Sequence, residues 1–180
     1  MGNMTSREVG SAGATTYAYD GLDRMTQAAY PGGPTINKSY NARGRLLTVT
    51  GGDGGNRTYG YDANDNLTSE TINVDGRTFT ATYTYNSLDQ LSSVIYPQTT
   101  RTVSYAPSAL GRPTQASPYV TGVSYHSSGQ LSGITYANGA TVSYGQNSRL
   151  WPSSFTASKG GAFINSTYGY DGVGNLTSVG

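Results

Sequence analysis

Polar and apolar residues alternate most regularly between Arg77 and Tyr85. Phe79, Ala81 and Tyr83 occupy every second position, and threonines stand between them. Successive side chains of a β-strand point to opposite faces, so this alternation predicts a strand with one apolar and one polar face. Apolar residues nowhere recur at the three- and four-residue spacing of a helix over more than a turn. The pattern therefore predicts an all-β protein.

The stretch that begins at Tyr59 shows how such strands are connected. Tyr59 and Tyr61 are two residues apart, which places them on the same face of a strand. The residues from Asp62 to Asn66 favour a turn, because Asp and Asn side chains bond to nearby backbone amides and accept left-handed backbone angles. Leu67 then resumes a strand, so the stretch predicts a β-hairpin.

This hairpin pattern recurs along the chain. Each copy has a tyrosine, usually Asp or Asn, two or three variable residues, Gly or Asp, a polar residue and Leu. Such a fixed period is typical of a repeat architecture. The copies at Tyr105 and Tyr144 depart most from the pattern. The eight opening tyrosines, 19–26 residues apart, are Tyr19, Tyr40, Tyr61, Tyr85, Tyr105, Tyr125, Tyr144 and Tyr170.

The chain divides into a lead and a repeat segment. Residues 1–14 are rich in Gly, Ser and Ala and lack alternation, which predicts a flexible lead that is frayed or weakly paired. Residues 15–180 form one continuous segment of about eight repeats. The expected strands are 15–19, 25–30, 35–40, 45–50, 56–61, 67–74, 77–85, 91–96, 101–105, 120–125, 130–136, 140–144, 150–155 (interrupted by Pro152), 162–170 and 176–179.

Composition narrows the architecture. Leu, Ile, Val and Phe are 28 of the 180 residues, too few for a thick core between two sheets, whereas 16 tyrosines supply aromatic area. The net charge of +1 argues against disorder and, because the arginines are scattered, against a nucleic-acid partner. There is no cysteine and no apolar run long enough to span a membrane. A single curved or rolled layer of strands is therefore expected.

The recurring residues have a structural role in this interpretation. We expect the repeat tyrosines to be mostly buried and to pack on the leucines of their hairpins. The residues assigned to the repeat are Tyr19, Asp20, Tyr40, Tyr61, Asp62, Leu67, Tyr85, Leu91, Tyr105, Tyr125, Leu131, Tyr144, Tyr170, Asp171 and Leu176.

The repeated pattern resembles the YD-repeat family, also called the Rhs-repeat family. Tyr-x-Tyr-Asp occurs at 17–20, 59–62 and 168–171, and the pattern covers nearly the whole chain. The resemblance implies repetitive antiparallel hairpins in a curved or spiralling single-layer sheet that is part of a hollow shell. It implies a structural segment that encloses a C-terminal toxin or effector payload of a bacterial secreted or cell-surface protein. The implied partners are the remainder of the shell and the enclosed polypeptide. Residues 1–13 show no apolar segment typical of a signal peptide.

The sequence offers little for catalysis. His126 is the only histidine and stands at a turn position where other copies carry Asp or Asn. The turn aspartates Asp20, Asp62, Asp89 and Asp171 recur at one site, which indicates a structural role rather than paired acid catalysis. Because no metal-ligand cluster is visible, we expect no catalytic residue, no cofactor and no metal, and we predict that the chain is not an enzyme.

Two other functions stay open. Repeated tyrosine rings on one face of the sheet could stack on sugars, if they are exposed. Trp151, with Tyr144 and Phe155 near it in sequence, is a candidate sugar platform. A less favoured alternative is an enzyme that acts on polysaccharides, which would place His126 with an Arg and a Tyr in an exposed groove. His126 and Trp151 are therefore the candidate binding residues.

Overall fold

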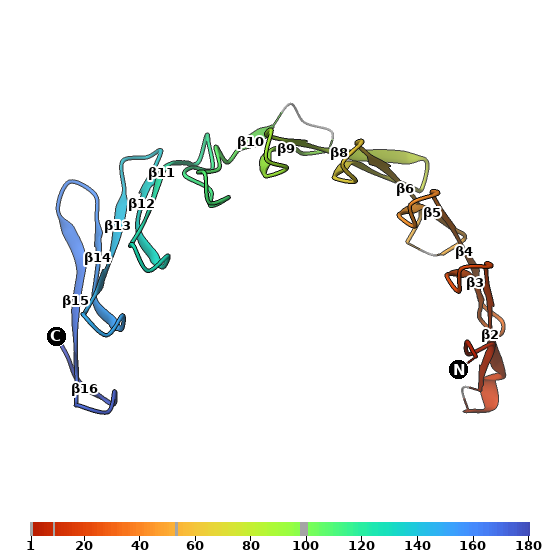
Figure 1. Cartoon of the computed structure of the whole chain (residues 1–180), viewed down its shortest axis with the longest axis horizontal. Helices are drawn as coiled ribbons and strands as arrows, with labels where there is room; N and C mark the ends of the chain where they lie inside the picture. The colour runs from red at the N-terminus through yellow and green to blue at the C-terminus, as the bar shows by residue number, and fades with distance from the viewer. Residues whose placement is uncertain (1, 9, 53, 98–100) are drawn as a thin grey trace. The chain divides into compact units, whose positions relative to one another are not determined.

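The computed structural model describes residues 2–8, 10–52, 54–97 and 101–180 and shows an all-β chain, as predicted. The chain divides into two compact units. Unit 1 comprises Met1–Thr84 and Ile95–Arg101, and unit 2 comprises Tyr85–Val94 and Thr102–Gly180. Within each unit the strands follow one another in chain order and pair antiparallel (Figure 1).

Unit 1 holds strands β1 to β8, apart from the last residue of β8. β1 pairs with β2 although its three residues are exposed, so part of the expected lead joins the sheet. Met1 and Val9 of that lead lie outside the described residues. Between β1 and β2 lies the short 3-10 helix η1 (Gly10–Ala12). The strands are β1 (Ser6–Glu8), β2 (Ala14–Tyr19), β3 (Met25–Ala29), β4 (Thr35–Tyr40), β5 (Leu46–Thr50), β6 (Asn56–Tyr61), β7 (Leu67–Val74) and β8 (Arg77–Tyr85).

Unit 2 holds strands β9 to β16, apart from the last residue of β9. The expected strands are confirmed, with ends displaced by at most three residues. Pro152 begins a strand instead of interrupting one, because the first residue of a strand can lack an N–H donor. The strands are β9 (Leu91–Ile95), β10 (Thr102–Ser104), β11 (Val120–Tyr125), β12 (Leu131–Tyr136), β13 (Thr141–Gln146), β14 (Pro152–Ser158), β15 (Ala162–Tyr170) and β16 (Leu176–Val179).

Eight turns of one geometry, which we call YD turns, recur along the chain. The first residue donates its N–H to the carbonyl of the fifth, and the fourth donates its N–H to the carbonyl of the first, at 2.8–3.3 Å. The fourth residue has a φ between 57° and 100° in every turn. This left-handed conformation closes the turn and favours Gly, Asp or Asn. The YD turns span residues 20–24, 41–45, 62–66, 86–90, 108–112, 126–130, 147–151 and 171–175.

The side chain of the first turn residue holds the YD turn together. In six turns this residue is Asp or Asn, and its Oδ1 accepts the N–H groups of the third and fifth residues at 2.8–3.1 Å. Ser108 and His126 take this place in the other two turns. The side chain thus satisfies two backbone donors that the sheet cannot pair, which explains why Asp and Asn recur.

Each of six hairpins has the same irregularity beside its YD turn. The strand pairing shifts by one residue between the last two residues before the turn, for example between Gly60 and Tyr61. This residue then pairs with the residue that follows the turn, so the expected tyrosine–leucine pairing across the hairpin is confirmed in the register. The partners are Tyr61 with Leu67, Tyr125 with Leu131, and Tyr170 with Leu176.

In three hairpins the tyrosine before the YD turn also connects its hairpin to the preceding one. Its hydroxyl donates a hydrogen bond to the backbone carbonyl of the residue that follows the previous YD turn. One polar group therefore links two successive repeats while its ring lies on the sheet. The donors and acceptors are Tyr40 with Met25, Tyr61 with Leu46, and Tyr125 with Pro113, at 2.8–2.9 Å.

Arginines connect neighbouring YD turns within each unit. In unit 1, Arg24 donates to the carbonyl of Asn41 at 3.2 Å, and its guanidinium carbon lies 4.7 Å from the ring centroid of Tyr40. In unit 2, Arg149 donates to the carbonyl of Gly172 at 2.5 Å. Neighbouring YD turns are thus linked to each other within each unit.

Little of the chain is buried, because each unit has one layer of strands. Among the described residues, the buried apolar side chains are Ala28, Val94, Val103 and Ala157, and none of them is large. The prediction that the repeat tyrosines are mostly buried is wrong, since no second layer covers them. All eight repeat tyrosines are half-buried, and the exposed repeat leucines are Leu91 and Leu176.

The structure also corrects the alignment of the two irregular copies. Tyr105 and Tyr144 lie two residues too early to precede a YD turn directly. These turns begin at Ser108 and Asn147, so the residues directly before them are Pro107 and Gln146. Pro107 pairs across its hairpin with Pro113, and Gln146 pairs with Pro152, as the tyrosines of regular copies pair with leucines.

Hydrogen bonds in the turns lower the pKa values of three carboxyl groups. The side chain of Arg24 is the main cause at Asp20, and its Nη2 lies 2.7 Å from the carboxylate. The side-chain amide of Asn175 has the same effect on the pKa of Asp171. At Asp62 burial acts to raise the pKa, but the hydrogen bonds within the turn outweigh it. These carboxyl groups therefore stabilise their turns as anions.

We predict that replacing Leu150 by Gly stabilises the protein. Leu150 is the fourth residue of its turn, with a φ of 66°, a conformation in which an L-residue other than Gly, Asn or Asp is strained. Leu150→Gly should raise the free energy of unfolding by about 1 kcal/mol, as measured by urea denaturation. Leu110→Gly is the matched control, because Leu110 lies outside the left-handed region; it should lower stability or leave it unchanged. Equal effects of both changes would contradict the assignment.

We also predict a loss of stability in acid. A folded-state pKa below the unfolded value means that the contribution is complete above the unfolded pKa of about 4 and disappears as pH falls through the folded pKa. The free energy of unfolding should therefore decline below about pH 4. Asp171→Asn should flatten this decline and keep the turn, because Asn stands first in the turns at Asn41 and Asn86. If the free energy of unfolding of Asp171→Asn declined with pH as steeply as that of the unaltered protein, Asp171 would not contribute to the loss of stability in acid.

Candidate binding groove

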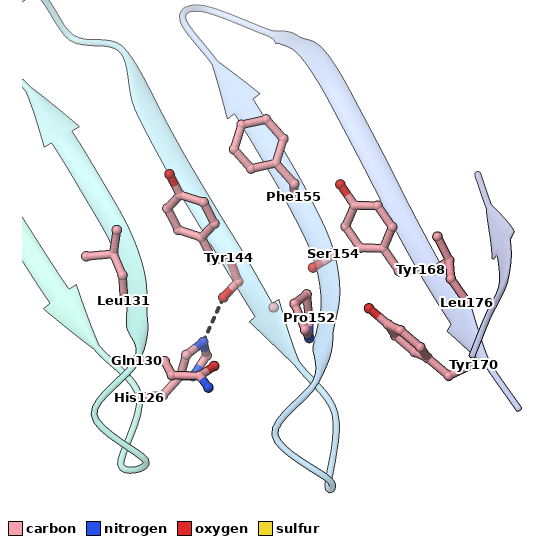
Figure 2. A pocket seen from close by; sticks show the side chains of 11 residues that line it. His126, Gln130, Leu131, Tyr144, Pro152, Ser154, Phe155, Tyr168, Tyr170 and Leu176 are labelled. Carbon is pink, nitrogen blue, oxygen red and sulfur yellow. Dashed lines mark hydrogen bonds between the residues drawn. The ribbon is translucent and has the colours of Figure 1, made fainter. Parts of the chain in front are cut away.

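A groove of about 580 Å³ lies on unit 2 across strands β12 to β16 (Figure 2). The residues that form it come from the YD turn at 126–130 and from strands that flank this turn and the next two. Most of its surface is apolar and aromatic, and no Lys, Arg, Asp or Glu lines it among the residues that the structure describes. The lining residues are His126, Gln130, Leu131, Tyr144, Gly145, Pro152, Ser154, Phe155, Tyr168, Tyr170 and Leu176.

The alternation of side chains along the strands creates this groove. Tyr144 and Phe155 are opposite each other in the register of β13 and β14, and their ring centroids are 5.4 Å apart. Figure 2 shows the side chain of Tyr168 on the neighbouring strand β15. Leu131 and Leu176, which follow their YD turns, add aliphatic surface. The groove is therefore the tyrosine and leucine face of the repeat, left uncovered by the single layer of strands.

His126 has a structural partner in this groove. It is half-buried, and its Nε2 donates a hydrogen bond to the backbone carbonyl of Tyr144 at 2.7 Å (Figure 2). Its N–H bonds to the carbonyl of Gln130, as in every YD turn. His126 thus links the YD turn at 126–130 to strand β13. The groove brings His126 together with tyrosines but, among the described residues, not with the arginine that a polysaccharide-cleaving site was expected to need.

Trp151 lies outside this groove. Its ring centroid is 5.3 Å from that of Tyr170, and the guanidinium carbon of Arg149 lies 5.2 Å from the Trp151 ring. The edge of the indole lies against Gly174, where an added Cβ would be 3.0 Å away. Trp151 is half-buried and packs between two YD turns, so the expected platform of Trp151 with Tyr144 and Phe155 does not form.

The described residues contain no group of three or more His, Cys, Asp or Glu side chains that could hold a metal ion. The carboxylates of Asp20, Asp62 and Asp171 accept hydrogen bonds from their own turns, and Asp89 is the fourth residue of its turn, not the first. No helix in the described part of the chain has the length and apolar character needed to cross a bilayer.

The groove can bind chemically neutral, apolar or ring-shaped groups. Aromatic rings offer flat apolar faces, and Gln130 and Ser154 offer polar groups at its edge. Sequence reasoning named Tyr144, Leu131, Tyr170 and Leu176 only as repeat residues. The sequence pattern marks Tyr168 only as part of a Tyr-x-Tyr-Asp motif and Pro152 only as a strand interruption, although Tyr168 alternates with Tyr170 along β15 and so lies on the same face.

Comparison with known proteins identifies one repeat and the fold. Residues 40–78 match the model of the RHS Repeat family. These residues run from the tyrosine before the second YD turn to strand β8, and so include the turn at Asp62. Among curated proteins, none matches the chain in sequence.

Solved structures of toxin complexes have the same fold. The chain is similar to TcdB2-TccC3, with a TM-score of 0.59 and 14% identity, over 99% of this chain and 12% of that one. It is also similar to the Tc holotoxin pore of Photorhabdus luminescens, with a TM-score of 0.60 and 14% identity, over the same shares. TcdB2-TccC3 without its hypervariable C-terminal region gives a TM-score of 0.59 at 14% identity and the same coverage. The chain thus spans about an eighth of the length of the chains that it matches.

Residues 40–78 of this chain thus match the RHS Repeat, and the resemblance of the chain to the YD-repeat, or Rhs-repeat, family is confirmed.

Proposed function

We propose that this chain is a wall segment of a β-repeat shell that encloses a polypeptide payload, in a secreted or cell-surface toxin-like protein. One observation carries the proposal: the hairpins are joined sideways into a single layer that leaves its own aromatic face uncovered. A layer with four small buried apolar side chains among its described residues cannot be a conventional globular core. Its uncovered aromatic face is suited to lie against another polypeptide.

The lateral links support this role. A wall must resist separation of its repeats, and tyrosine and arginine hydrogen bonds join several successive repeats in addition to the strand pairing. The fold shared with TcdB2-TccC3 supports the same proposal, because TccC3 is also part of the Tc holotoxin pore of Photorhabdus luminescens. The partners are then the remainder of the shell and the enclosed polypeptide.

Protection from proteolysis tests this function. In the full-length polypeptide that carries these repeats, we expect the segment beyond them to resist protease for as long as the wall is intact. Asn41→Ala removes the side-chain acceptor of two turn N–H groups and should speed cleavage of that segment, as followed by mass spectrometry. Asn41→Asp keeps the acceptor and should behave as the unaltered protein does. Cleavage of the payload at the same rate in all three proteins would contradict enclosure.

A carbohydrate-binding surface is the second candidate, favoured by the uncharged aromatic groove. Sugar rings stack on aromatic faces such as those of Tyr144, Phe155 and Tyr168. The wall proposal expects the purified chain to bind none of a panel of polysaccharides. Binding that Phe155→Ala abolishes, and that Phe163→Ala at an exposed site outside the groove preserves, would favour this candidate.

We propose further that the chain is not an enzyme. Its histidine and its turn carboxylates serve the turns, and catalysis needs a group free to exchange a proton with a substrate. The same polysaccharide panel, with added ester substrates, should show no turnover. His126→Asn keeps a residue that other YD turns use. Turnover that disappears in His126→Asn, with the fold intact, would contradict this proposal and favour the enzyme alternative.

A further inference from the structure

The chain contains a single Asn-Gly step, Asn138-Gly139, in the link between β12 and β13. This link closes with the same two backbone hydrogen bonds as a YD turn. Tyr136 donates its N–H to the carbonyl of Ala140 at 2.8 Å, and Gly139 donates its N–H to the carbonyl of Tyr136 at 3.0 Å. Asn138 and Gly139 are thus the third and fourth residues of the link, and Gly139 has a φ of 83°. Both residues are exposed to water.

The side chain of Asn138 is held close to the backbone that follows it. Its Oδ1 accepts the N–H of Ala140 at 3.0 Å. This hydrogen bond closes a ring around the backbone nitrogen of Gly139, so the carboxamide carbon of Asn138 stays on the side of that nitrogen. The same N–H lies at the oxygen that becomes negative when a nucleophile adds to the carboxamide carbon, as a donor of an oxyanion hole does.

Gly139 leaves its own backbone nitrogen unhindered. Apart from its chain neighbours, no described atom lies within 4 Å of the place where a Cβ would be. A residue without a Cβ also reaches unusual backbone angles at little cost, which eases the closure of a small ring through its nitrogen. The step therefore combines a positioned carboxamide with an accessible nucleophile.

The YD turns do not contain this combination. In those with Asn as the first residue, the side chain is bonded in the same way, but Ala or Ser follows. In those with Gly as the second residue, the first residue is Asp, whose lowered pKa keeps it an anion and hence a poor electrophile. The Asn residues are Asn41, Asn86 and Asn147, and the Asp residues are Asp20 and Asp171.

We propose that Asn138 is a site of spontaneous deamidation, with water as the second reactant. The backbone nitrogen of Gly139 forms a bond to Cγ of Asn138, the C–N bond of the carboxamide breaks, and ammonia leaves with the proton that the backbone nitrogen has lost. Water then opens the resulting five-membered succinimide at either carbonyl carbon. One opening gives aspartate at position 138, and the other gives isoaspartate, whose main chain is longer by one methylene. The net change consumes one water, releases one ammonia and involves no oxidation or reduction.

Isoaspartate at this position should open the link. The extra methylene separates the N–H of Gly139 from the carbonyl of Tyr136. It also displaces Ala137, whose N–H donates to the carbonyl of Tyr119 at 2.8 Å. Deamidation further places a carboxylate in residues 113–148, which contain no Lys, Arg, Asp or Glu. Since the ammonia is lost to solvent, the link loosens irreversibly as the chain ages. The inference does not depend on an enclosed payload.

Peptide mass spectrometry of the purified chain, incubated in mildly alkaline buffer, tests the site. Asn64 is the internal control, because it is the exposed third residue of the YD turn at 62–66 and is followed by Asp65 instead of Gly. Asn138 should lose its amide at least about tenfold faster than Asn64, which corresponds to a difference of about 1.4 kcal/mol in the barrier. Both aspartate and isoaspartate should form. Equal rates at the two residues, or a product without isoaspartate, would overturn the proposal.

Gly139→Asp is the matched variant for the nucleophile. Asp is the fourth residue of the turns at Asp23, Asp65 and Asp89, with a φ of 57–67°, so circular dichroism should show an unchanged fold. The side chain hinders the backbone nitrogen, and loss of the amide at Asn138 should slow by about tenfold. An unchanged rate in this variant would show that the glycine has no part in the reaction.

Asn138→Asp separates the effect of charge from that of the longer main chain. Freshly prepared, it carries the new carboxylate but keeps the normal backbone. Hydrogen exchange of the amides of Ala137 and Gly139 should remain as slow as in the unaltered chain, whereas in the isoaspartate form it should become faster. Equal exchange in the isoaspartate form and the unaltered chain would contradict the opening of the link.

Discussion

The fold depends on how one side-chain oxygen closes a five-residue turn. The Oδ1 atom of the first residue satisfies two backbone donors, and the left-handed fourth residue brings the chain back on itself. Once the turn is fixed, the bulge beside it places a tyrosine opposite a leucine, and the tyrosine hydroxyl then reaches the previous hairpin. Local geometry thus determines lateral assembly, and long-range packing contributes little because few side chains are buried.

Lateral links take the place of a core in this architecture. A globular domain of this length normally buries large aliphatic side chains between two layers, whereas here the buried apolar residues in the described ranges are no larger than Val. Tyrosine suits the task because its ring covers the sheet and its hydroxyl bonds to a neighbouring backbone. The result is a sheet that is stable by repetition, in which each hairpin supports the next.

Much of the fold could be predicted from the sequence, because the information is local. Alternation gave the strands, and the turn residues gave their connections, to within three residues at each end. Tyrosine does not mark the turns of the copies at Tyr105 and Tyr144, where the fixed feature is the positive φ at Gly111 and Leu150. The burial of Tyr61 could not be predicted, since it depends on whether a second layer exists. The separation of Trp151 from Phe155 depends in the same way on packing between repeats, which sequence order does not reveal.

Pairing of each strand with its neighbours in sequence has a mechanical consequence. A force that pulls the two ends of such a unit apart acts perpendicular to the strands. It therefore breaks the hydrogen bonds between neighbouring strands one pair of strands at a time. Each hairpin would yield separately, and a repeat of about 21 residues would release roughly 70 Å of extended chain. The sheet should therefore lengthen in regular steps under tension and absorb work at each one, whereas a domain with a single cooperative core would fail at once.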